Sequence, residues 1–269
     1  MKILVTGSSG FVGTHLENLL KDKHEIIPFD LKVGRDIRNS EALDKFMLGV
    51  DAVIHLAALV VGPESWERPN EYFETNGVGT LNVVLSAIKN KVKRIIVASS
   101  AAIYGEPLNP YGASKRWAEE VSETYRKQIE TFVVRPFNIY GQGQNPAYGY
   151  AIHSFANGIK ENGKISIFGD GNQTRDFISV KDVTQTMELL LTCKVIPDKP
   201  IDLGTGKEIS INDLAKLEGK ILKKSFDVLY NEKRKEPYKS VADISGLESL
   251  GLNPELFTKL EDGLRELIV

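Results

Sequence analysis

Residues 6–13 read Thr-Gly-Ser-Ser-Gly-Phe-Val-Gly, and they join a short apolar run, Lys2–Thr6, to a stretch with helical spacing. The three glycines have the spacing of a dinucleotide-binding turn between a strand and a helix. Gly7 would allow the tight turn, Gly10 would let backbone N–H groups approach a pyrophosphate, and Gly13 would let the helix pack closely on the strand. The helix N-terminus would add partial positive charge. The chain is therefore expected to begin with a cofactor-binding strand–turn–helix unit.

A second strand pattern, Glu25–Phe29, ends at Asp30, seventeen residues after Gly13. A carboxylate at this place accepts hydrogen bonds from the ribose 2′-hydroxyl and would repel a 2′-phosphate, so Asp30 favours NAD over NADP. Lys32 and Arg35 lie close by in the sequence and keep NADP as an alternative.

Two further segments are candidates for the cofactor site. Asp36, before Ile37, could accept from an adenine amino group or could cap a turn. The small residues at 56–58, Leu-Ala-Ala, would admit a cofactor or allow close packing of a helix on the sheet. His55 is expected to be a satisfied core residue, and because no second His or Cys stands at metal-ligand spacing, we expect no metal site.

Short apolar runs alternate with helical patterns, which predicts an α/β fold of the Rossmann type with a doubly wound parallel sheet. The expected buried strands are Lys2–Thr6, Glu25–Phe29, Ala52–Leu56, Arg94–Ala98 and Thr131–Arg135. Beyond Tyr140 comes a stretch rich in Gly, Gln, Asn and Tyr, 141–150, which is typical of a binding loop. We expect the Rossmann domain at 1–140 and 173–205, with a small C-terminal substrate-binding lobe at 141–172 and 206–269.

Composition limits the class of protein. The chain has 269 residues, 42% of them hydrophobic, and a net charge of -2, which argues against nonspecific nucleic-acid binding. The single cysteine, Cys193, indicates a reducing compartment. No apolar stretch approaches the ~20 residues of a membrane-spanning helix. We therefore expect a cytoplasmic protein with neither a nucleic-acid nor a membrane partner.

The fourth strand pattern is followed by Ser100 and then by a helix-start signal, Asn109-Pro110. On that helix Tyr111 and Lys115 would share one face. A free tyrosine titrates near 10, and a lysine charge about 6 Å away, at an effective dielectric of about 20, would favour the phenolate by roughly 2.8 kcal/mol. With a positive nicotinamide ring nearby, Tyr111 is expected to act as a base, while Ser100 binds the reacting oxygen and Lys115 the nicotinamide ribose.

Together these motifs resemble the extended short-chain dehydrogenases of the NAD-dependent epimerase/dehydratase family, and within it the UDP-glucose 4-epimerases. The resemblance spans nearly the whole chain. It is carried by TGSSGFVG at 6–13, HLAA at 55–58, NGVGTLNVV at 76–84, SSAAIYG at 99–105, YGASK at 111–115, RPFNIYGQGQNP at 135–146, GDGNQTRDFISVKDV at 169–183, DLGTGKEISI at 202–211 and SVADIS at 240–245.

The resemblance implies roles for individual positions. The residues expected at NAD are Gly7, Gly10, Phe11, Val12, Gly13, Asp30, Asp36, Ile37, Leu56, Ala57, Ala58, Asn76, Ser99, Tyr111, Lys115 and Phe137. The expected substrate-binding residues are Ser100, Asn138, Arg175 and Arg234, and the expected catalytic set is Ser100, Tyr111 and Lys115. Asn138 and Arg175 would bind a diphosphate, which suits the guanidinium fork.

Three of these positions have alternatives. Asn76 could be a structural amide, Arg175 could form a salt bridge with the adjacent Asp176, and Arg234 could be a surface charge or give its place to Lys233.

The residues after Ser100 bear on the reaction. Family members that eliminate water carry an acidic pair there, and decarboxylases carry a glutamate. This chain has Ala101 and Ala102, which cannot transfer a proton. The expected function is therefore NAD-dependent 4-epimerisation of a nucleotide sugar of the UDP-glucose/UDP-galactose type, through a transient 4-keto intermediate. An NAD(P)H-dependent nucleotide-sugar reductase or dehydratase, and a non-catalytic NAD(P)-binding redox sensor, are the alternatives.

Two other features follow from the resemblance. The segment 106–110 is shorter than the usual family loop, which forms part of the wall of the sugar site. The sequence therefore does not identify the sugar. The family also implies a homodimer, formed by helices near 70–90 and 111–128. Leu81, Val84, Leu85 and Ile88 could lie in that interface or within the monomer core.

Overall fold

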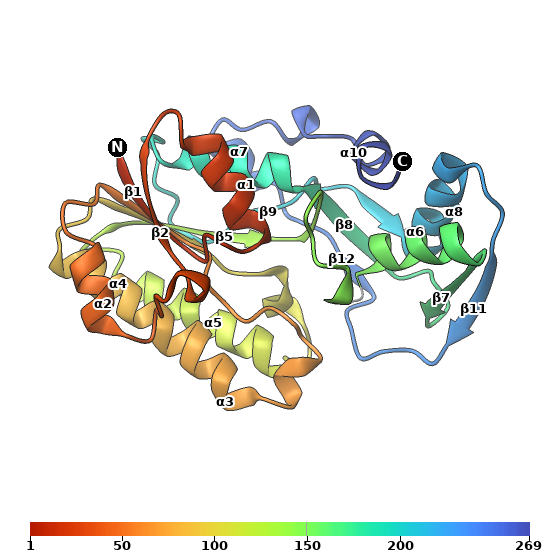
Figure 1. Cartoon of the computed structure of the whole chain (residues 1–269), viewed down its shortest axis with the longest axis horizontal. Coiled ribbons are helices and arrows are strands. Elements are labelled where there is room, and N and C mark those ends of the chain that lie inside the picture. Colours follow the sequence, from red (N-terminus) through yellow and green to blue (C-terminus); the bar gives the residue numbers. More distant parts are fainter. Residues whose placement is uncertain (149) are drawn as a thin grey trace.

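A parallel sheet of six strands organises the chain in the computed structural model, which describes residues 1–148 and 150–269 (Figure 1). Gly149 of the predicted binding loop lies outside the described residues. In spatial order the strands are β2 (Glu25–Phe29), β1 (Lys2–Thr6), β3 (Ala52–His55), β4 (Arg94–Ala98), β5 (Glu130–Pro136) and β9 (Ile201–Leu203). Every neighbouring pair is parallel, so the predicted Rossmann-type sheet is confirmed.

Helices cover both faces of this sheet. Helix α1 (Phe11–Leu20) packs beside α7 (Val180–Leu190) on one face, while α2 (Ser40–Phe46), α4 (Gly79–Lys89) and α5 (Pro110–Thr124) pack on the other (Figure 1). The two-residue period of β1 divides its side chains between them: Ile3 and Val5 join the core under α1 and α7, and Leu4 joins the opposite core. Among the described residues, no helix is long and apolar enough to cross a bilayer.

Of the α4 residues expected in a dimer interface or in the core, Leu81, Val84 and Ile88 pack in the core. Val84 is fully buried, whereas Leu85 is 42% exposed and the positions that complete the buried face are Val83 and Ala87. The short helix α3 (Pro69–Tyr72) and a wider turn at Phe73–Val78 lead into α4.

The rest of the chain builds a second, smaller core. Strand β8 (Thr174–Ser179) lies between β10 (Glu208–Ser210) and β12 (Lys239–Ser240), and it also pairs with β6 (Asn138–Tyr140). A two-stranded sheet joins β7 (Lys164–Phe168) to β11 (Asp227–Asn231). Helices α6 (Ala151–Glu161), α8 (Ile211–Leu222) and α10 (Leu260–Ile268) pack around these strands, and the short α9 (Ser245–Ser249) lies against β9. The predicted domain boundaries at 140, 172 and 205 stay a prediction.

Candidate active site

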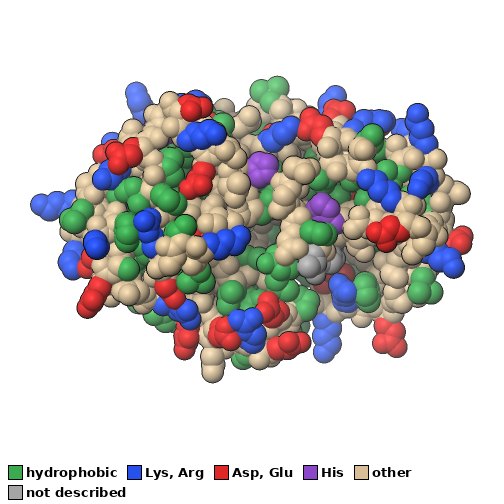
Figure 2. Space-filling view, in the orientation of Figure 1, with side chains coloured by type: hydrophobic (Ala, Val, Ile, Leu, Met, Phe, Trp, Pro, Cys, Tyr) green, Lys and Arg blue, Asp and Glu red, His purple; other side chains and the backbone are tan. Residues whose placement is uncertain are grey.

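A cleft of about 1130 Å³ runs from the glycine turn to the small core. The face shown in Figure 2 is hollowed near its centre, and side chains of both charges are intermingled around the hollow. The cleft is lined by residues that follow β1, β3, β4 and β5, whose carboxyl ends lie at one edge of the sheet. The chain crosses from one side of the sheet to the other between β1 and β3, and such a switch point is where α/β proteins bind ligands.

The glycine turn is packed so closely on neighbouring backbone that it has no space for side chains at two of its positions. A Cβ atom at Gly7, where φ is +70°, would lie 2.7 Å from the Ala57 nitrogen, and one at Gly13 would lie 2.3 Å from the Gly7 carbonyl oxygen. No side chain caps the first amides of α1, whose N-cap residue is Gly10. A helix N-terminus of this kind, lining a cleft, fits the pyrophosphate of a dinucleotide.

Asp30 lines the cleft beside the glycine turn and is oriented by backbone amides. Its carboxylate accepts from Ser9 N at 3.2 Å and from Lys32 N at 2.8 Å. The nearby cations donate to backbone carbonyls: Lys32 to that of Ser9, and Arg35 to that of Pro28 while stacking 3.8 Å above Phe46. This arrangement favours the ribose hydroxyls of NAD over a 2′-phosphate.

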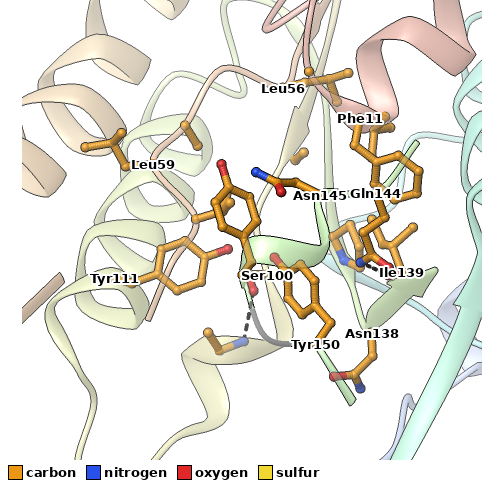
Figure 3. Close-up of a pocket in the computed structure, with 18 of the residues that line it drawn as sticks. Phe11, Leu56, Leu59, Ser100, Tyr111, Asn138, Ile139, Gln144, Asn145 and Tyr150 are labelled. Carbon is orange, nitrogen blue, oxygen red and sulfur yellow. Dashed lines mark hydrogen bonds between the residues drawn. The ribbon is translucent and has the colours of Figure 1, made fainter. Parts of the chain in front are cut away.

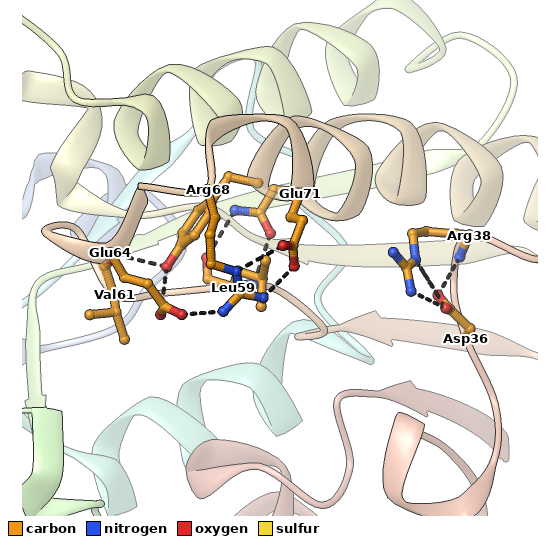
Figure 4. A network of polar contacts seen from close by, with 9 residues as sticks. Asp36, Arg38, Leu59, Val61, Glu64, Arg68 and Glu71 are labelled. Carbon is orange, nitrogen blue, oxygen red and sulfur yellow. Dashed lines mark hydrogen bonds and ion pairs between the residues drawn. The ribbon is translucent and has the colours of Figure 1, made fainter. Parts of the chain in front are cut away.

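Asp36 also lines the cleft but is already paired (Figure 4). Arg38 donates to both of its oxygens, from Nε to Oδ1 at 3.1 Å and from Nη2 to Oδ2 at 2.6 Å, and these bonds lower the pKa of Asp36. Its carboxylate also accepts from Arg38 N, as a turn-capping aspartate does. The adenine contact predicted for Asp36 must therefore be shared with this ion pair.

His55 is a satisfied core residue, as predicted. It is 2% exposed and lies between two hydroxyls: its Nδ1 is 2.7 Å from Thr6 Oγ1 and its Nε2 is 2.9 Å from Thr80 Oγ1. Thr6 Oγ1 in turn accepts from the amides of Leu56 and Ala57, which line the cleft. Burial lowers the pKa of His55 to about 3, so the imidazole is neutral at pH 7.

Asn76 is the one predicted site residue that the structure does not bring into the cleft. Its side chain is 1% exposed, accepts from Leu59 N at 2.8 Å, and donates to the Leu59 carbonyl and to Ser114 Oγ. Asn76 therefore acts as the structural amide weighed as its alternative, and it fixes Leu59 in the cleft wall.

The predicted catalytic set lies together in the middle of the cleft. Asn109 caps α5 by accepting from Gly112 N at 2.7 Å, and this fixes the helix that carries both Tyr111 and Lys115. Ser100 lies beyond the end of β4 and makes a hydrogen bond to the Tyr111 side chain. In Figure 3 the hydroxyls of Ser100 and Tyr111 point toward each other across the cleft.

Burial controls the ionisation of this set in the protein alone. Burial raises the pKa of Tyr111 to about 12, and the hydrogen bond from Ser100 opposes this shift only in part. Lys115 donates to the Ala98 carbonyl at 2.7 Å, and burial lowers its own pKa to about 8. The acidic phenol expected beside a positive nicotinamide ring stays a prediction, and in the protein alone desolvation dominates the pKa of Tyr111.

Two arginines line the opposite end of the cleft. Arg175, on β8, forms an ion pair at 2.8 Å with Glu236, and Arg234 stacks 3.5 Å above the Phe168 ring. Asp176 does not pair with Arg175, so that alternative is wrong. Its carboxylate is fully buried and accepts from the amides of residues 205, 206 and 242.

Asn138 faces the same end of the cleft and donates to the Asp176 carbonyl at 2.8 Å. Sequence reasoning missed several residues of the wall, among them Tyr148, Tyr150, Phe168, Ile211 and Glu236. The tyrosines of the 141–150 loop were the available signal. Figure 3 shows the Tyr150 ring beside Ser100 and Tyr111.

A glycine turn at the sheet's switch point, with a Tyr–Lys helix behind it, defines a dinucleotide-binding enzyme of the extended short-chain dehydrogenase class. The family model described as "NAD dependent epimerase/dehydratase family" matches residues 3–203, and the chain belongs to that family. NAD is the cofactor of this family, and the glycine turn and Asp30 fit it.

Individual relatives agree with this placement. The chain is 33% identical to a putative UDP-glucose 4-epimerase of Methanocaldococcus jannaschii, over 99% of this chain and 97% of the relative. It is also 33% identical to UDP-glucuronate 4-epimerase of Thermodesulfobacterium geofontis, over 98% and 94%. The crystal structure of Thermotoga maritima UDP-glucose 4-epimerase with UDP-glucose superimposes with a TM-score of 0.92, at 27% identity, covering 100% of this chain and 97% of that one.

Proposed function

We propose that this protein is an NAD-dependent nucleotide-sugar 4-epimerase of the UDP-glucose/UDP-galactose type, working through a transient 4-keto sugar. The observation that carries the proposal is the meeting of Ser100 and Tyr111 in a cleft where Ala101 and Ala102 occupy the adjacent wall. A dehydratase needs a general acid beside the leaving hydroxyl, and neither alanine can provide one.

Each residue of the set has one task in the reaction. Tyr111 takes the proton of the sugar 4-hydroxyl at its phenolic oxygen and later returns it, while Ser100 donates a hydrogen bond to the same sugar oxygen. NAD, when bound, supplies hydride transfer at the sugar carbon and a positive ring beside the phenol. Burial raises the pKa of Tyr111 to about 12, so formation of the phenolate needs a nearby positive charge. Lys115 is the residue of this chain that is proposed to provide one.

The keto sugar must rotate inside the cleft, so that its opposite face receives the hydride, while the rest of the substrate stays bound. Arg175 and Arg234 are proposed to hold the diphosphate, with Asn138 beside them, since a guanidinium fork matches phosphate oxygens. The Glu236 carboxylate now paired with Arg175 must then share or release that arginine when a diphosphate binds.

The test is to incubate the purified protein with a panel of nucleotide sugars, without added cofactor, and to follow the anomeric signals by proton NMR. Formation of a 4-epimer with no net reduction of NAD is expected. Tyr111→Phe should reduce the rate by about 10²–10⁴-fold. Tyr230→Phe, which alters a surface hydroxyl bonded to Asn212, should leave the rate unchanged.

Other outcomes would replace the proposal. Conversion only with stoichiometric NADPH would indicate a reductase, and loss of water from the sugar would indicate a dehydratase. Bound NAD with no conversion of any sugar would indicate a redox sensor.

We also propose a homodimer through the face formed by the Phe73–Val78 turn, α4 and α5. Phe73, Val78, Leu85 and Trp117 are 36–42% exposed there, and the Phe73 and Trp117 rings lie 6.3 Å apart. Light scattering is expected to give twice the chain mass for the wild type and for Leu189→Arg, which lies on α7. Leu85→Arg should give the monomer mass, and an unchanged dimer would contradict this interface.

A further inference from the structure

Lys115 is buried in a way that requires a counter-ion. Its side chain is 5% exposed, its ammonium group donates to the Ala98 carbonyl at 2.7 Å, and burial favours the neutral amine. The one group that acts in the opposite direction, toward the ammonium form, is the carboxylate of Glu119. Glu119 lies four residues further along α5, so it is stacked one helical turn from Lys115.

Glu119 is itself buried, at 5% exposure, and it is held by side chains from two strands. Arg135, on β5, donates to both carboxylate oxygens, from Nε at 2.9 Å and from Nη2 at 2.8 Å. Ser99, after β4, donates its hydroxyl to Glu119 Oε1. Two parallel hydrogen bonds from a guanidinium fix both the position and the orientation of a carboxylate.

The same guanidinium extends this contact to the edge of the sheet. Arg135 Nη1 donates to the Tyr104 hydroxyl at 2.7 Å, and Tyr104 donates to Asp202 Oδ1, on β9, at 2.7 Å. Asp202 Oδ2 accepts from the amide of Asp243, in the segment that follows β12. The buried cluster thus contains two cations, Lys115 and Arg135, and two carboxylates, Glu119 and Asp202, so its formal charges balance.

We propose that Glu119 is a positioning residue for the active site: its carboxylate, fixed by Arg135 and Ser99, is the counter-ion that keeps the Lys115 side chain cationic and bonded at the end of β4. This rests on the proposed function, in which Lys115 favours the Tyr111 phenolate through its charge. Without Glu119 the lysine would face burial with no opposing carboxylate, and the amine would release its proton at a lower pH.

The other titratable groups around Lys115 cannot act as its counter-ion. His55, from β3, is neutral near pH 7 because burial lowers its pKa to about 3, so it carries no charge that could stabilise the Lys115 ammonium group. Tyr111, on α5, keeps its proton because burial raises its pKa to about 12. Arg135, from β5, is a cation and acts only through Glu119.

The test compares Glu119→Gln with Glu120→Gln, a matched control on the next, exposed position of α5. In the NAD-loaded enzyme, the alkaline limb of the pH dependence of kcat/KM is expected to move down by about one pH unit in Glu119→Gln, since Arg135 already neutralises part of the carboxylate charge. Glu120→Gln should keep the wild-type profile, and Glu119→Asp, which retains the charge, should restore most of it.

A second readout does not depend on turnover. The ¹³Cε signal of Lys115, assigned by its absence in Lys115→Met, should titrate about one pH unit lower in Glu119→Gln. Failure of the epimerase assay with this NMR shift present would overturn the proposed function but not the role of Glu119. Should Glu119→Gln not fold, Glu119→Gln/Arg135→Met removes both buried charges and should lower the Lys115 titration by a smaller amount, because the repulsion from Arg135 is lost as well. A Lys115 titration equal to that of the Glu120→Gln control would overturn the proposal.

Discussion

Replacing Glu218 by methionine is expected to stabilise the protein at pH 8 and to change its stability little at pH 5. Glu218 lies on α8 within the small core, with no exposed surface, and neither carboxylate oxygen has a hydrogen-bond partner among the described residues. Burial raises the pKa of this carboxyl from its ordinary 4.5 to about 9. The folded protein therefore keeps the proton at neutral pH, whereas the unfolded chain loses it.

The sign and size follow from proton linkage. A group whose pKa is raised by folding binds more protons in the folded state, so the free energy of unfolding falls as the pH rises from the unfolded pKa toward the folded one. Between pH 5 and pH 8 this window spans about three pH units, or roughly 3–4 kcal/mol at 1.36 kcal/mol per unit. Methionine has similar length and no proton to release, so Glu218→Met lacks this slope.

Urea denaturation followed by circular dichroism at pH 5, 6.5 and 8 measures the effect. The difference in unfolding free energy between Glu218→Met and the wild type should grow by roughly 3 kcal/mol across that range. Glu161→Gln, at the exposed end of α6, serves as the control and should show no comparable growth. A Glu218→Met difference that is the same at all three pH values would refute the reasoning.

Three further predictions concern the cleft. Gly13→Val should weaken NAD binding by more than about 10²-fold by calorimetry, because its Cβ would lie 2.3 Å from the Gly7 carbonyl oxygen, and unchanged affinity would disprove the close approach. Arg175→Met should raise the Kd for UDP by about 10–100-fold, the cost of lost charged hydrogen bonds, with the Kd for NAD unchanged; equal loss of both would point to general damage. Asp30→Ala should reduce the preference for NAD over NADP by roughly 10-fold in paired titrations, and a preserved ratio would remove Asp30 from cofactor selection.

The main sheet could be predicted from the sequence because buried parallel strands are continuous apolar runs. All five expected strands occur, with their ends within one residue of the prediction. The strands of the small core were harder to find. Strand β11 (Asp227–Asn231) is exposed or half-buried throughout, and β7 (Lys164–Phe168) buries alternate residues over only five positions. The alternation in β7 is a weak strand signal because it is so short, and β11 gives no pattern distinct from a loop.

The sequence could predict those cleft residues whose position follows directly from the order of strands and helices along the chain. The glycine turn, Ser100 and the Tyr111–Lys115 pair follow strands whose carboxyl ends meet at one edge of the sheet. Contacts across the chain could not be predicted, and they decide how the site residues behave. Asn76 is held by Leu59, and Arg175 is paired with Glu236, a residue from a distant segment. The raised pKa of Tyr111 likewise depends on burial, which a motif does not reveal.

The contacts of His55 fix the direction of a whole line of hydrogen bonds. Thr80 gives its hydroxyl proton to the Asn76 carbonyl at 2.6 Å, so His55 Nε2 must be the donor to Thr80 and Nδ1 must be the acceptor from Thr6. Both lone pairs of the Thr6 oxygen then remain for the amides of Leu56 and Ala57. A second proton on the imidazole would present this oxygen with three donors, so protonation of His55, which does not line the cleft, would disturb the backbone of Leu56 and Ala57 in the cleft wall.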